Sequence, residues 1–518
     1  MRLLLTLCLA FMCLTREMGQ ACPTTFTTSE CYFNGAATKQ PSYSNPNQFF
    51  IVGGLFDVHN KGDGTQLCSD QISSAGILNV LAFFWAIDRY SAQIIDTNRI
   101  SVGAVAFDNC MRPEMTLKHI LSYAQCDIFI QNLPASNLVA FVGPYTNEDA
   151  TRAGNIASDL KITLVSPTAN ALDQSLTKQN TLLRLSPSFV YDLKAIVEFL
   201  KQVKSGYVII IYAGSDSFWK AAFDELKNQM DQSICIQYTA DYNSIAMNDL
   251  LSALSLRKKA KYIVPLMSKS DFGDLLEAMN TSNLTNLESF NYIITSGIGK
   301  DNKFLSSFGI LTTGSIVIDH EESSTDWTSF TSYLTSVQNN STLVKYVPSR
   351  WLTSISSMLP SDWLNATSYL KHSLINTLKS VLGIIQGVDT LMRTGCASRT
   401  NYQFCDSFRN QANSREEIIY TEIKSVTIDK LEKQYSYSIF LPETESFLEI
   451  GSAIVVSSSG SLSTKFYINV MDVNRFGYKF SVPVCPIPGE CCEPPTTQQP
   501  VITTSGSQSD VTPNQKSR

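Results

Sequence analysis

The chain has 518 residues, and 40 Lys and Arg against 46 Asp and Glu give it a formal net charge of −6. With 44% hydrophobic and 17% charged residues, its composition is that of a globular protein and excludes a disordered, collagen-like or coiled-coil chain. At about 150 residues per domain, the length predicts two to four domains. No block is dense in Lys or Arg, so nucleic acid is not an expected partner.

The N-terminus has the pattern of a secretory signal peptide. Met1 and Arg2 precede an apolar run over 3–14, and Gly19-Gln20-Ala21 forms a small-residue cleavage site, which predicts a signal peptide over 1–21. The run is shorter than the about 20 residues that a membrane-spanning helix needs, and no later run reaches that length. We expect a secreted, extracellular protein without a membrane span, either a complete product or the truncated ectodomain of a receptor.

Cysteines and glycosylation motifs fit an oxidising compartment. Of 13 cysteines, Cys8 and Cys13 leave with the signal peptide and eleven remain, an odd number that predicts an intermolecular bridge or a free thiol. Their spacings match no zinc module, so disulfides are expected. N-glycosylation is predicted at five Asn-X-Ser/Thr motifs: Asn280, Asn283, Asn339, Asn340 and Asn365.

Short apolar runs alternate with helical patterns from about residue 48. The runs predict strands over 49–56, 100–107, 138–143, 162–165, 207–212, 234–238, 262–266, 292–295 and 315–318. Between them, apolar residues recur at helical spacing over 76–91, 193–200 and 374–385. Strand and helix in repeated alternation predict an α/β fold with parallel sheets, and strands that are apolar throughout indicate that helices cover both faces.

Two groups of these units predict two α/β lobes. We expect lobe I over about 45–187 and 366–460, and lobe II over about 188–365 and 461–485. Past residue 430 the pattern changes to hairpin-like strands over 453–456 and 465–472, around a Ser/Gly turn at 457–461. The segment 486–518 is rich in Pro, Thr, Ser and Gln and is predicted to be a disordered tail.

Several segments, in order, resemble the ectodomains of metabotropic glutamate receptors. Segment 50–59 (FIVGGLFDVH), followed by Lys61-Gly62 and Cys68, is similar to their first strand and loop, and 101–110 (SVGAVAFDNC) to their second strand. The segments 142–144 (VGP), 162–168 (ITLVSPT), 183–187 (LRLSP) and 314–318 (GSIVI) follow in the same order. The similarity runs from about 48 to about 475.

This resemblance implies a clamshell of the periplasmic-binding-protein type, the Venus flytrap domain of class C G-protein-coupled receptors, in which two lobes close over a small ligand. The family's disulfide scheme carries over as Cys68 with Cys110 and Cys396 with Cys405. Cys126 stands where the family has a bridge between protomers, which implies a disulfide-linked homodimer. Cys235 corresponds to a cysteine that pairs with a cysteine-rich stalk, for which this chain offers only Cys485, Cys491 and Cys492.

The resemblance also places a ligand site between the lobes. In the family, hydroxyls and backbone after the Gly-Pro turn and after the next strand hold an amino-acid ligand. Those positions here are Thr146, Asn147, Thr168, Ala169 and Asn170. Because Thr and Asn are favoured helix caps whatever their function, an ordinary capping role for Thr146 or Asn147 is the competing interpretation.

Other family ligand contacts have changed type. The family's arginine that holds the distal carboxylate aligns with Asn79, and a nearby tyrosine aligns with Ala75. A second tyrosine falls near Ser217 or Phe218. Two acidic residues of the family fall at Phe189 and Gly297, and a lysine falls at Ser373. An amide does not replace a bidentate guanidinium, so glutamate is not the expected ligand. Asp216 is the only nearby acid that we identify as a substitute, and a solvated loop acid at a helix start is the alternative role for it.

Enzyme signatures are missing from the sequence. The four histidines, His59, His119, His320 and His372, form no HExxH motif, and no G-x-S-x-G or P-loop occurs. The run 319–322 (DHEE) is interpreted as a solvated loop after a strand rather than a metal site. Catalysis, a cofactor and a metal are therefore not expected.

Three functional hypotheses remain. The first is a secreted ligand-binding domain that closes over an amino-acid-like or other polar metabolite. The second is a structural or decoy dimer whose cleft no longer binds. The third is a receptor ectodomain of the natriuretic-peptide or guanylate-cyclase type, which shares the lobes and binds at other surfaces.

Overall fold

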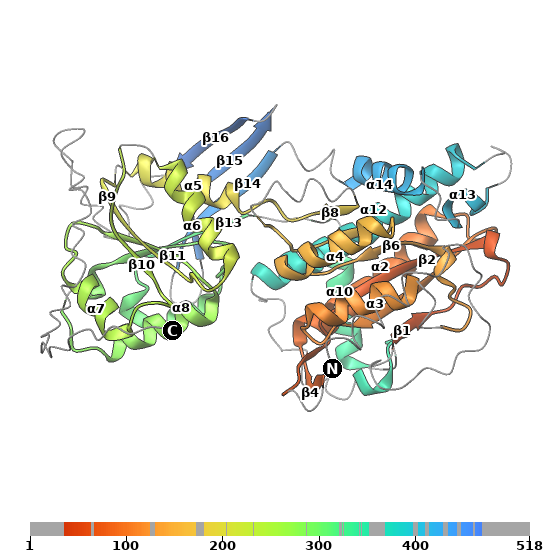
Figure 1. Cartoon of the computed structure of the whole chain (residues 1–518), viewed down its shortest axis with the longest axis horizontal. Coiled ribbons are helices and arrows are strands. Elements are labelled where there is room, and N and C mark those ends of the chain that lie inside the picture. The colour runs from red at the N-terminus through yellow and green to blue at the C-terminus, as the bar shows by residue number, and fades with distance from the viewer. Residues whose placement is uncertain are drawn as a thin grey trace, which may run out of the picture.

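The computed structural model describes residues 36–468 with gaps, and its two lobes lie side by side (Figure 1). The described ranges are 36–63, 67–124, 130–171, 181–203, 205–230, 233–285, 287–320, 324, 326–340, 342, 344–351, 368–396, 402–409, 414–427, 434–442, 447–458 and 461–468. The signal peptide, Cys126, Asn365 and the tail over 486–518 lie outside these residues. No helix in the described ranges is long and apolar enough to cross a membrane.

Lobe I contains a six-stranded sheet in the order β1-β5-β2-β6-β7-β8. Only the edge strand β1 is antiparallel to its neighbour. The strands are β1 (Ala36–Lys39), β2 (Phe49–Phe56), β5 (Ser101–Asp108), β6 (Leu138–Val142), β7 (Thr163–Ser166) and β8 (Leu182–Arg184). A separate hairpin, β3 (His59–Lys61) and β4 (Cys68–Ile72), follows β2.

Helices cover both faces of this sheet, as the sequence pattern predicts. Along β2, Phe50 and Val52 belong to one apolar cluster and Phe49 and Ile51 to the other, because successive side chains of a strand point to opposite faces. One cluster contains α2 (Ser74–Ile94) and α12 (Ser368–Thr394), and the other contains α3 (Pro113–Ala124) and α4 (Asn147–Asp159).

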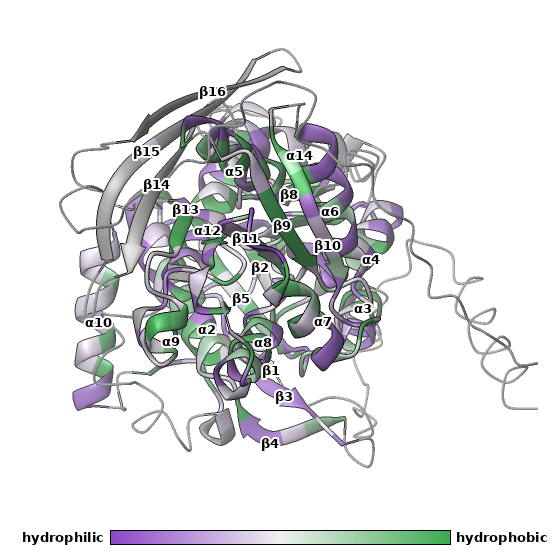
Figure 2. Ribbon diagram, turned by 90° about the vertical axis from the view of Figure 1, so that its left-hand side faces the viewer, coloured by the Kyte–Doolittle hydropathy of each residue, from purple (hydrophilic) through white to green (hydrophobic). Residues whose placement is uncertain are grey.

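Lobe II contains an eight-stranded sheet in the order β10-β9-β11-β12-β13-β14-β15-β16. Its first five strands are parallel: β9 (Tyr207–Tyr212), β10 (Cys235–Asp241), β11 (Tyr262–Leu266), β12 (Asn291–Ile294) and β13 (Ile316–His320). Helices α5 (Val190–Gln202), α6 (Ser217–Gln229), α7 (Met247–Ser255), α8 (Lys269–Thr281) and α9 (Asn302–Ser306) surround it. Figure 2 shows β9 and β13 in green, whereas purple turns lie on the surrounding helices.

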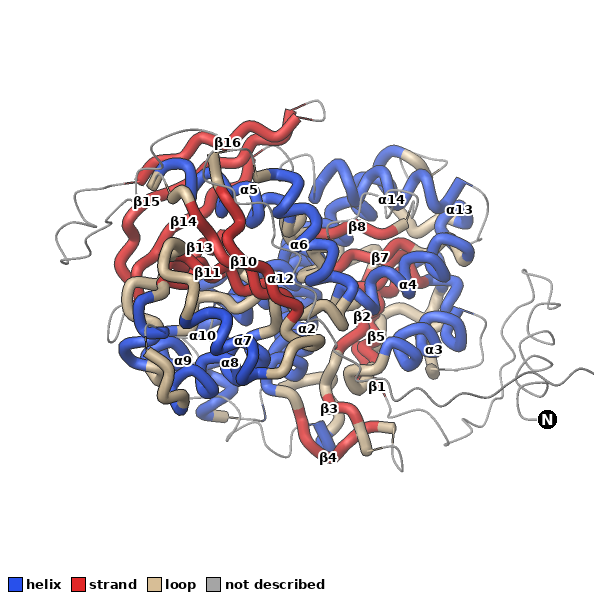
Figure 3. Tube along the Cα trace, turned by 60° about the vertical axis from the view of Figure 1, so that its left-hand side comes forward, coloured by secondary structure: helices blue, strands red, loops and turns tan. Residues whose placement is uncertain are grey.

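An antiparallel extension completes this second sheet. β14 (Gln434–Pro442) pairs with β13, β15 (Phe447–Ser458) with β14, and β16 (Ser461–Ile468) with β15 (Figure 3). The hairpin predicted around 457–461 is therefore present, with Ser458 opposite Ser461. Helices α13 (Asp406–Arg409) and α14 (Ser414–Thr427) precede β14.

The chain changes lobes at points that differ from the expected boundaries. Helix α10 (Trp327–Asn339), expected in lobe II, buries Phe330 and Leu334 in the lobe I core. Its start is held by Asp326, which accepts hydrogen bonds from Arg89 Nε at 2.8 Å and Tyr90 Oη at 2.9 Å. The segment 366–460 was expected in lobe I. From residue 434 onward it belongs instead to lobe II, because β14 and β15 extend the lobe II sheet. The structure thus moves both boundaries.

The start of α2 packs tightly against the end of β2. A Cβ built on Gly76 would lie 1.9 Å from the Asp57 carbonyl oxygen, which no side chain tolerates. The Gly76 N–H also donates to the capping hydroxyl of Ser73 at 3.1 Å. A glycine is therefore required where the helix meets the strand end.

We predict that Gly76→Ala destabilises the protein by about 1–3 kcal/mol, because the added methyl displaces the backbone of the Asp57 loop. Thermal unfolding followed by circular dichroism measures this loss. Gly273→Ala in α8 is the matched control, since its nearest contact is the ring edge of Phe304 at 3.3 Å and alanine favours a helix. Equal melting temperatures for wild type and Gly76→Ala would contradict the assignment.

Candidate functional site

A cavity of about 1320 Å³ lies between the lobes. Four helices begin at its wall, and their capping residues all line it: Ser73 of α2, Thr146 of α4, Asp216 of α6 and Ser268 of α8. Each capping side chain accepts a hydrogen bond from a backbone N–H of its own helix. Thr146 and Asp216 thus each cap a helix while lining the cavity, and four positive helix ends face one cavity.

The lobe I wall is a connected hydrogen-bond network. Asn147 Nδ2 donates to Asn170 Oδ1 at 3.0 Å, and the Asn170 N–H donates to Asn147 Oδ1 at 2.7 Å. Thr168 Oγ1 donates to the Tyr145 carbonyl oxygen. These contacts lock the α4 start to the loop after β7, so the wall is preformed.

Two carboxylates of lobe I also line the cavity, and the sequence interpretation did not identify them. Asp57 directly follows β2, and Asp149 lies in the first turn of α4. Burial, and then the negative charges of Asp149 and Asp108, raise the pKa of Asp57 to about 7. Burial raises the pKa of Asp149 to about 6, against a hydrogen bond from Thr146 that lowers it. The local signals were an acid at the end of a parallel strand and a Thr-x-x-Asp helix start.

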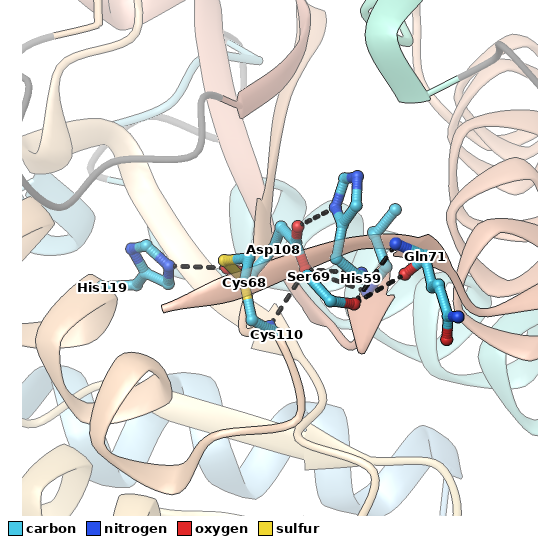
Figure 4. Close-up of polar contacts among 8 residues, drawn as sticks. His59, Cys68, Ser69, Gln71, Asp108, Cys110 and His119 are labelled. Atoms are coloured by element: carbon cyan, nitrogen blue, oxygen red, sulfur yellow. Dashed lines mark hydrogen bonds and ion pairs between the residues drawn. A yellow bond between two sulfur atoms is a disulfide. The ribbon is translucent and has the colours of Figure 1, made fainter. Parts of the chain in front are cut away.

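The wall behind Asp57 is fixed by Asp108 at the end of β5 (Figure 4). Asp108 Oδ1 accepts hydrogen bonds from the backbone N–H groups of Val58 at 3.0 Å and His59 at 3.1 Å, and its Oδ2 lies 2.5 Å from His59 Nδ1. Its carbonyl oxygen lies 2.9 Å from His119 Nε2. Burial lowers the pKa of His119 to about 4.

The lobe II wall is aromatic. The rings of Phe189, Phe218 and Trp219 lie 4.8 to 5.6 Å apart between centroids, and all three residues line the cavity. Gly297 makes room for them, since a Cβ there would lie 2.6 Å from Trp219. The aromatic rings share this wall with two charged lobe II residues, Asp216 and Lys269.

The strongly basic side chains among the described cavity residues are both in ion pairs. Arg152 Nη2 lies 2.6 Å from Glu148 Oε1, and Lys269 pairs with Asp301. With Asp57, Asp149 and Asp216 added, the described wall carries an excess of acids. This excess of acids opposes the preference of the four helix N-termini for an anion.

Comparison with known proteins identifies the family. The model of the receptor family ligand binding region matches residues 80–428, more than half of the chain. The chain belongs to this family of receptor ligand-binding regions. The expected α/β fold with two lobes and parallel sheets flanked by helices is confirmed as well.

Curated relatives of this ligand-binding region are metabotropic glutamate receptors. The chain is 23% identical over 292 residues to the metabotropic glutamate receptor of Drosophila melanogaster, covering 52% of the chain and 30% of that receptor. It is 22% identical over 254 residues to metabotropic glutamate receptor 4 of Macaca fascicularis, covering 45% and 28%. The chain thus aligns with less than a third of the length of these relatives.

Positions that the resemblance selects converge on the cavity of this ligand-binding region. Of the nine expected contact residues, eight line it: Asn79, Thr146, Asn147, Thr168, Asn170, Asp216, Ser217 and Phe218. Ala169 is 1% exposed and lies off the cavity wall, with its N–H donated to Ser166 Oγ at 3.2 Å. Asp216 is not the only acid near the ligand site, because Asp57 and Asp149 also line it.

Asn79 serves the packing of lobe I. Its Nδ2 donates to the Ala75 carbonyl oxygen at 2.9 Å, and its Oδ1 lies 3.1 Å from Ser373 Oγ and 2.9 Å from Thr377 Oγ1. Its Oδ1 ties α2 to α12, and its Nδ2 bonds within α2. It therefore does not take over the work of the family's arginine.

The expected intramolecular disulfides are present in the ligand-binding region. Cys68 bonds to Cys110 with Cα atoms 5.2 Å apart, and Cys396 bonds to Cys405 with Cα atoms 5.6 Å apart. Cys235 is also disulfide-bonded. Asn280, Asn283, Asn339 and Asn340 are exposed, as glycan attachment requires.

The run expected as a solvated loop is partly buried. Asp319 and His320 form the end of β13 and are 2% and 9% exposed, and His372 from α12, 7% exposed, lies beside them. The solvated-loop interpretation of these two residues is wrong, because the lobe II sheet ends against α12 at this point. Glu321 and Glu322 lie outside the described residues.

The raised pKa values of Asp57 and Asp149 predict how stability depends on pH. Their folded-state pKa values of about 7 and about 6 exceed the ordinary 3.8. At a pH between the ordinary and the folded-state pKa, the folded chain therefore binds more protons than the unfolded chain. Their contribution to stability therefore falls as the pH rises from about 4 to about 7. His119, with its lowered pKa, acts in the opposite direction over about 4 to 6.5.

We predict that Asp57→Asn gains in melting temperature over wild type, and that this gain is larger at pH 7.5 than at pH 5. The reason is that the variant removes a carboxylate that in the wild type must ionise while buried. Melting temperatures at pH steps from 4 to 8 measure the difference, in which the His119 contribution cancels. Asp224→Asn, at an exposed acid of α6, is the control. If the difference in melting temperature between Asp57→Asn and wild type is constant with pH, the raised pKa of Asp57 is refuted.

Proposed function

We propose that this chain is an extracellular ligand-binding domain that closes its two lobes over a small organic cation with an apolar or aromatic body. The observation that carries the proposal is the opposition of two walls across one cavity: carboxylates Asp57 and Asp149 on lobe I, and Phe189, Phe218 and Trp219 on lobe II. An ammonium group would neutralise the carboxylates, and the aromatic faces attract both cations and apolar groups.

The charge distribution argues against glutamate as the ligand. A second carboxylate on the ligand needs a cationic partner, and Arg152 and Lys269 already have carboxylate partners. Asn79, at the position of the family's arginine, uses its amide within lobe I. The metabotropic glutamate receptors among the relatives carry glutamate in their names, whereas this cavity fits a cation better.

The position of the two walls supports lobe closure on a ligand. A ligand favours the closed state only by the extra contacts that it makes there. The carboxylates belong to lobe I and the aromatic rings to lobe II, so a ligand that touches both gains its second set of contacts on closing. Ionisation of Asp57 beside an ammonium would also release a proton near neutral pH.

We predict that 2-phenylethylamine raises the melting temperature and binds with proton release, whereas 2-phenylethanol, 3-phenylpropionate and glutamate do not. Calorimetry in phosphate and in Tris measures the released protons, and small-angle X-ray scattering measures closure as a smaller radius of gyration. We expect Asp149→Asn to weaken amine binding about tenfold or more, as for loss of a charge-assisted hydrogen bond.

Asp224→Asn is the matched control for this experiment and should bind the amine as the wild type does. A folded wild type that does not bind 2-phenylethylamine would overturn the proposal and favour the hypothesis of a dimer whose cleft does not bind. Tighter binding of glutamate than of the amine would overturn the charge argument alone.

We also propose that the secreted chain is a homodimer linked through Cys126. The resemblance to the metabotropic receptors supports this proposal, together with the odd number of cysteines. We predict that a non-reducing gel of the secreted protein gives a band of twice the chain mass, and that Cys126→Ser gives the single mass. A dimer band that persists in Cys126→Ser would assign the bridge to another cysteine.

A further inference from the structure

Asp319, His320 and His372 meet at the boundary between the lobes. β13 ends at His320, and the chain then leaves lobe II for α10 of lobe I. His372 lies in the second turn of α12, whose apolar face packs in the lobe I core. The three side chains are buried, and their ligand atoms all lie within 4.8 Å of one another.

The two imidazoles approach the same carboxylate oxygen. His320 Nδ1 lies 3.8 Å and His372 Nδ1 lies 3.9 Å from Asp319 Oδ1, and the two rings lie 4.3 Å apart between centroids with a 30° tilt. These separations exceed a hydrogen bond. Ligand atoms about 2.1 Å from a tetrahedral metal ion are separated by about 3.4 Å. The two distances to Asp319 Oδ1 therefore need to shorten by about half an ångström for the three residues to hold one ion.

We propose that Asp319, His320 and His372 form a site for a divalent transition-metal ion of the Zn²⁺ type, which joins the two lobes at the hinge. Two imidazole nitrogens and one carboxylate oxygen are the donor set that Zn²⁺ accepts with one position left open. Mg²⁺ and Ca²⁺ prefer oxygen ligands only.

The ion has a path to this site. His320 and His372 both line the interlobe cavity, so the site opens onto solvent through the cleft. The other described cluster of metal-ligand types, Cys68, Asp108 and Cys110, lacks free thiolates because its cysteines are bonded to each other. The histidine cluster is therefore the stronger candidate.

A metal ion here would restrain the movement of the lobes. Asp319 and His320 move with the lobe II sheet, and His372 moves with α12 of lobe I. Coordination bonds to all three fix the distance between these elements at the hinge. The ion would thus stabilise the folded chain and narrow the range of lobe positions.

The test uses the purified, secreted chain after removal of metal with EDTA. We expect one Zn²⁺ per chain by calorimetry, a rise in melting temperature of a few degrees with Zn²⁺, no comparable rise with Mg²⁺, and the visible absorption of four- or five-coordinate Co²⁺. His320→Gln and His372→Gln should each weaken Zn²⁺ binding at least tenfold, and the double variant should abolish the Co²⁺ spectrum. Glu148→Gln, at an exposed acid on the same cavity, should bind Zn²⁺ as the wild type does.

A second measurement needs no variant. In wild type, Zn²⁺ should protect His320 and His372 from carbethoxylation by diethyl pyrocarbonate, as mapped by mass spectrometry, while modification of His59 is unchanged. The proposal is overturned if wild type binds no Zn²⁺, if the folded double variant binds it equally well, or if Zn²⁺ leaves His320 and His372 as reactive as before.

Discussion

The direction of the parallel strands is the constraint on which the rest of this structure depends. Strands of both lobes run with their carboxyl ends toward the interlobe cavity, and the helix after each strand must start there. For this reason the caps Ser73, Thr146, Asp216 and Ser268 share one cavity although they belong to different units of the fold. The gathering of many backbone N–H groups at one site is thus a product of the topology, whatever side chains lie there.

In this chain, positive helix N-termini and buried carboxylates lie on the same wall of the cavity. Helix N-termini favour anions, and the acids Asp57 and Asp149 lie on the same wall with raised pKa values. Burial is the largest cause of both shifts, so the carboxylates are poorly solvated and a neighbouring cation would stabilise their charged forms. The aromatic rings of lobe II add no competing positive charge. The lobe I wall thus contributes carboxylates to the cavity, and the lobe II wall contributes aromatic rings.

Much of the fold could be predicted from the sequence, and the reason lies in its periodicity. The apolar runs that became β2, β5, β9 and β11 are short and continuous, a pattern typical of strands buried on both faces. The lobe of α10 was not predictable in this way, because Phe330 and Leu334 have the same spacing whichever core they enter. Its placement depends on Asp326, whose partners Arg89 and Tyr90 lie in a distant part of the sequence.

The candidate site was predictable by position and less so by chemistry. The resemblance selected residues that line the cavity, but the engagement of Asn79 with α12 and the burial of Asp57 arise from tertiary contacts. Asp319 and His320 are adjacent in the sequence, and their neighbour His372 comes from a helix that begins at residue 368. No local pattern connects these segments, so only the folded chain shows the cluster.

The crossing of the chain between the lobes affects how the protein is made. Among the described residues it passes from lobe I to lobe II before α5, returns before α10 and crosses again before β14. Lobe I therefore lacks α10, α12 and α14 until the five parallel strands of lobe II have left the ribosome. During synthesis one face of the first sheet is covered by α2 alone for the time needed to translate this intervening segment. Lobe I is completed only after α14 and lobe II only after β16, although lobe I begins first.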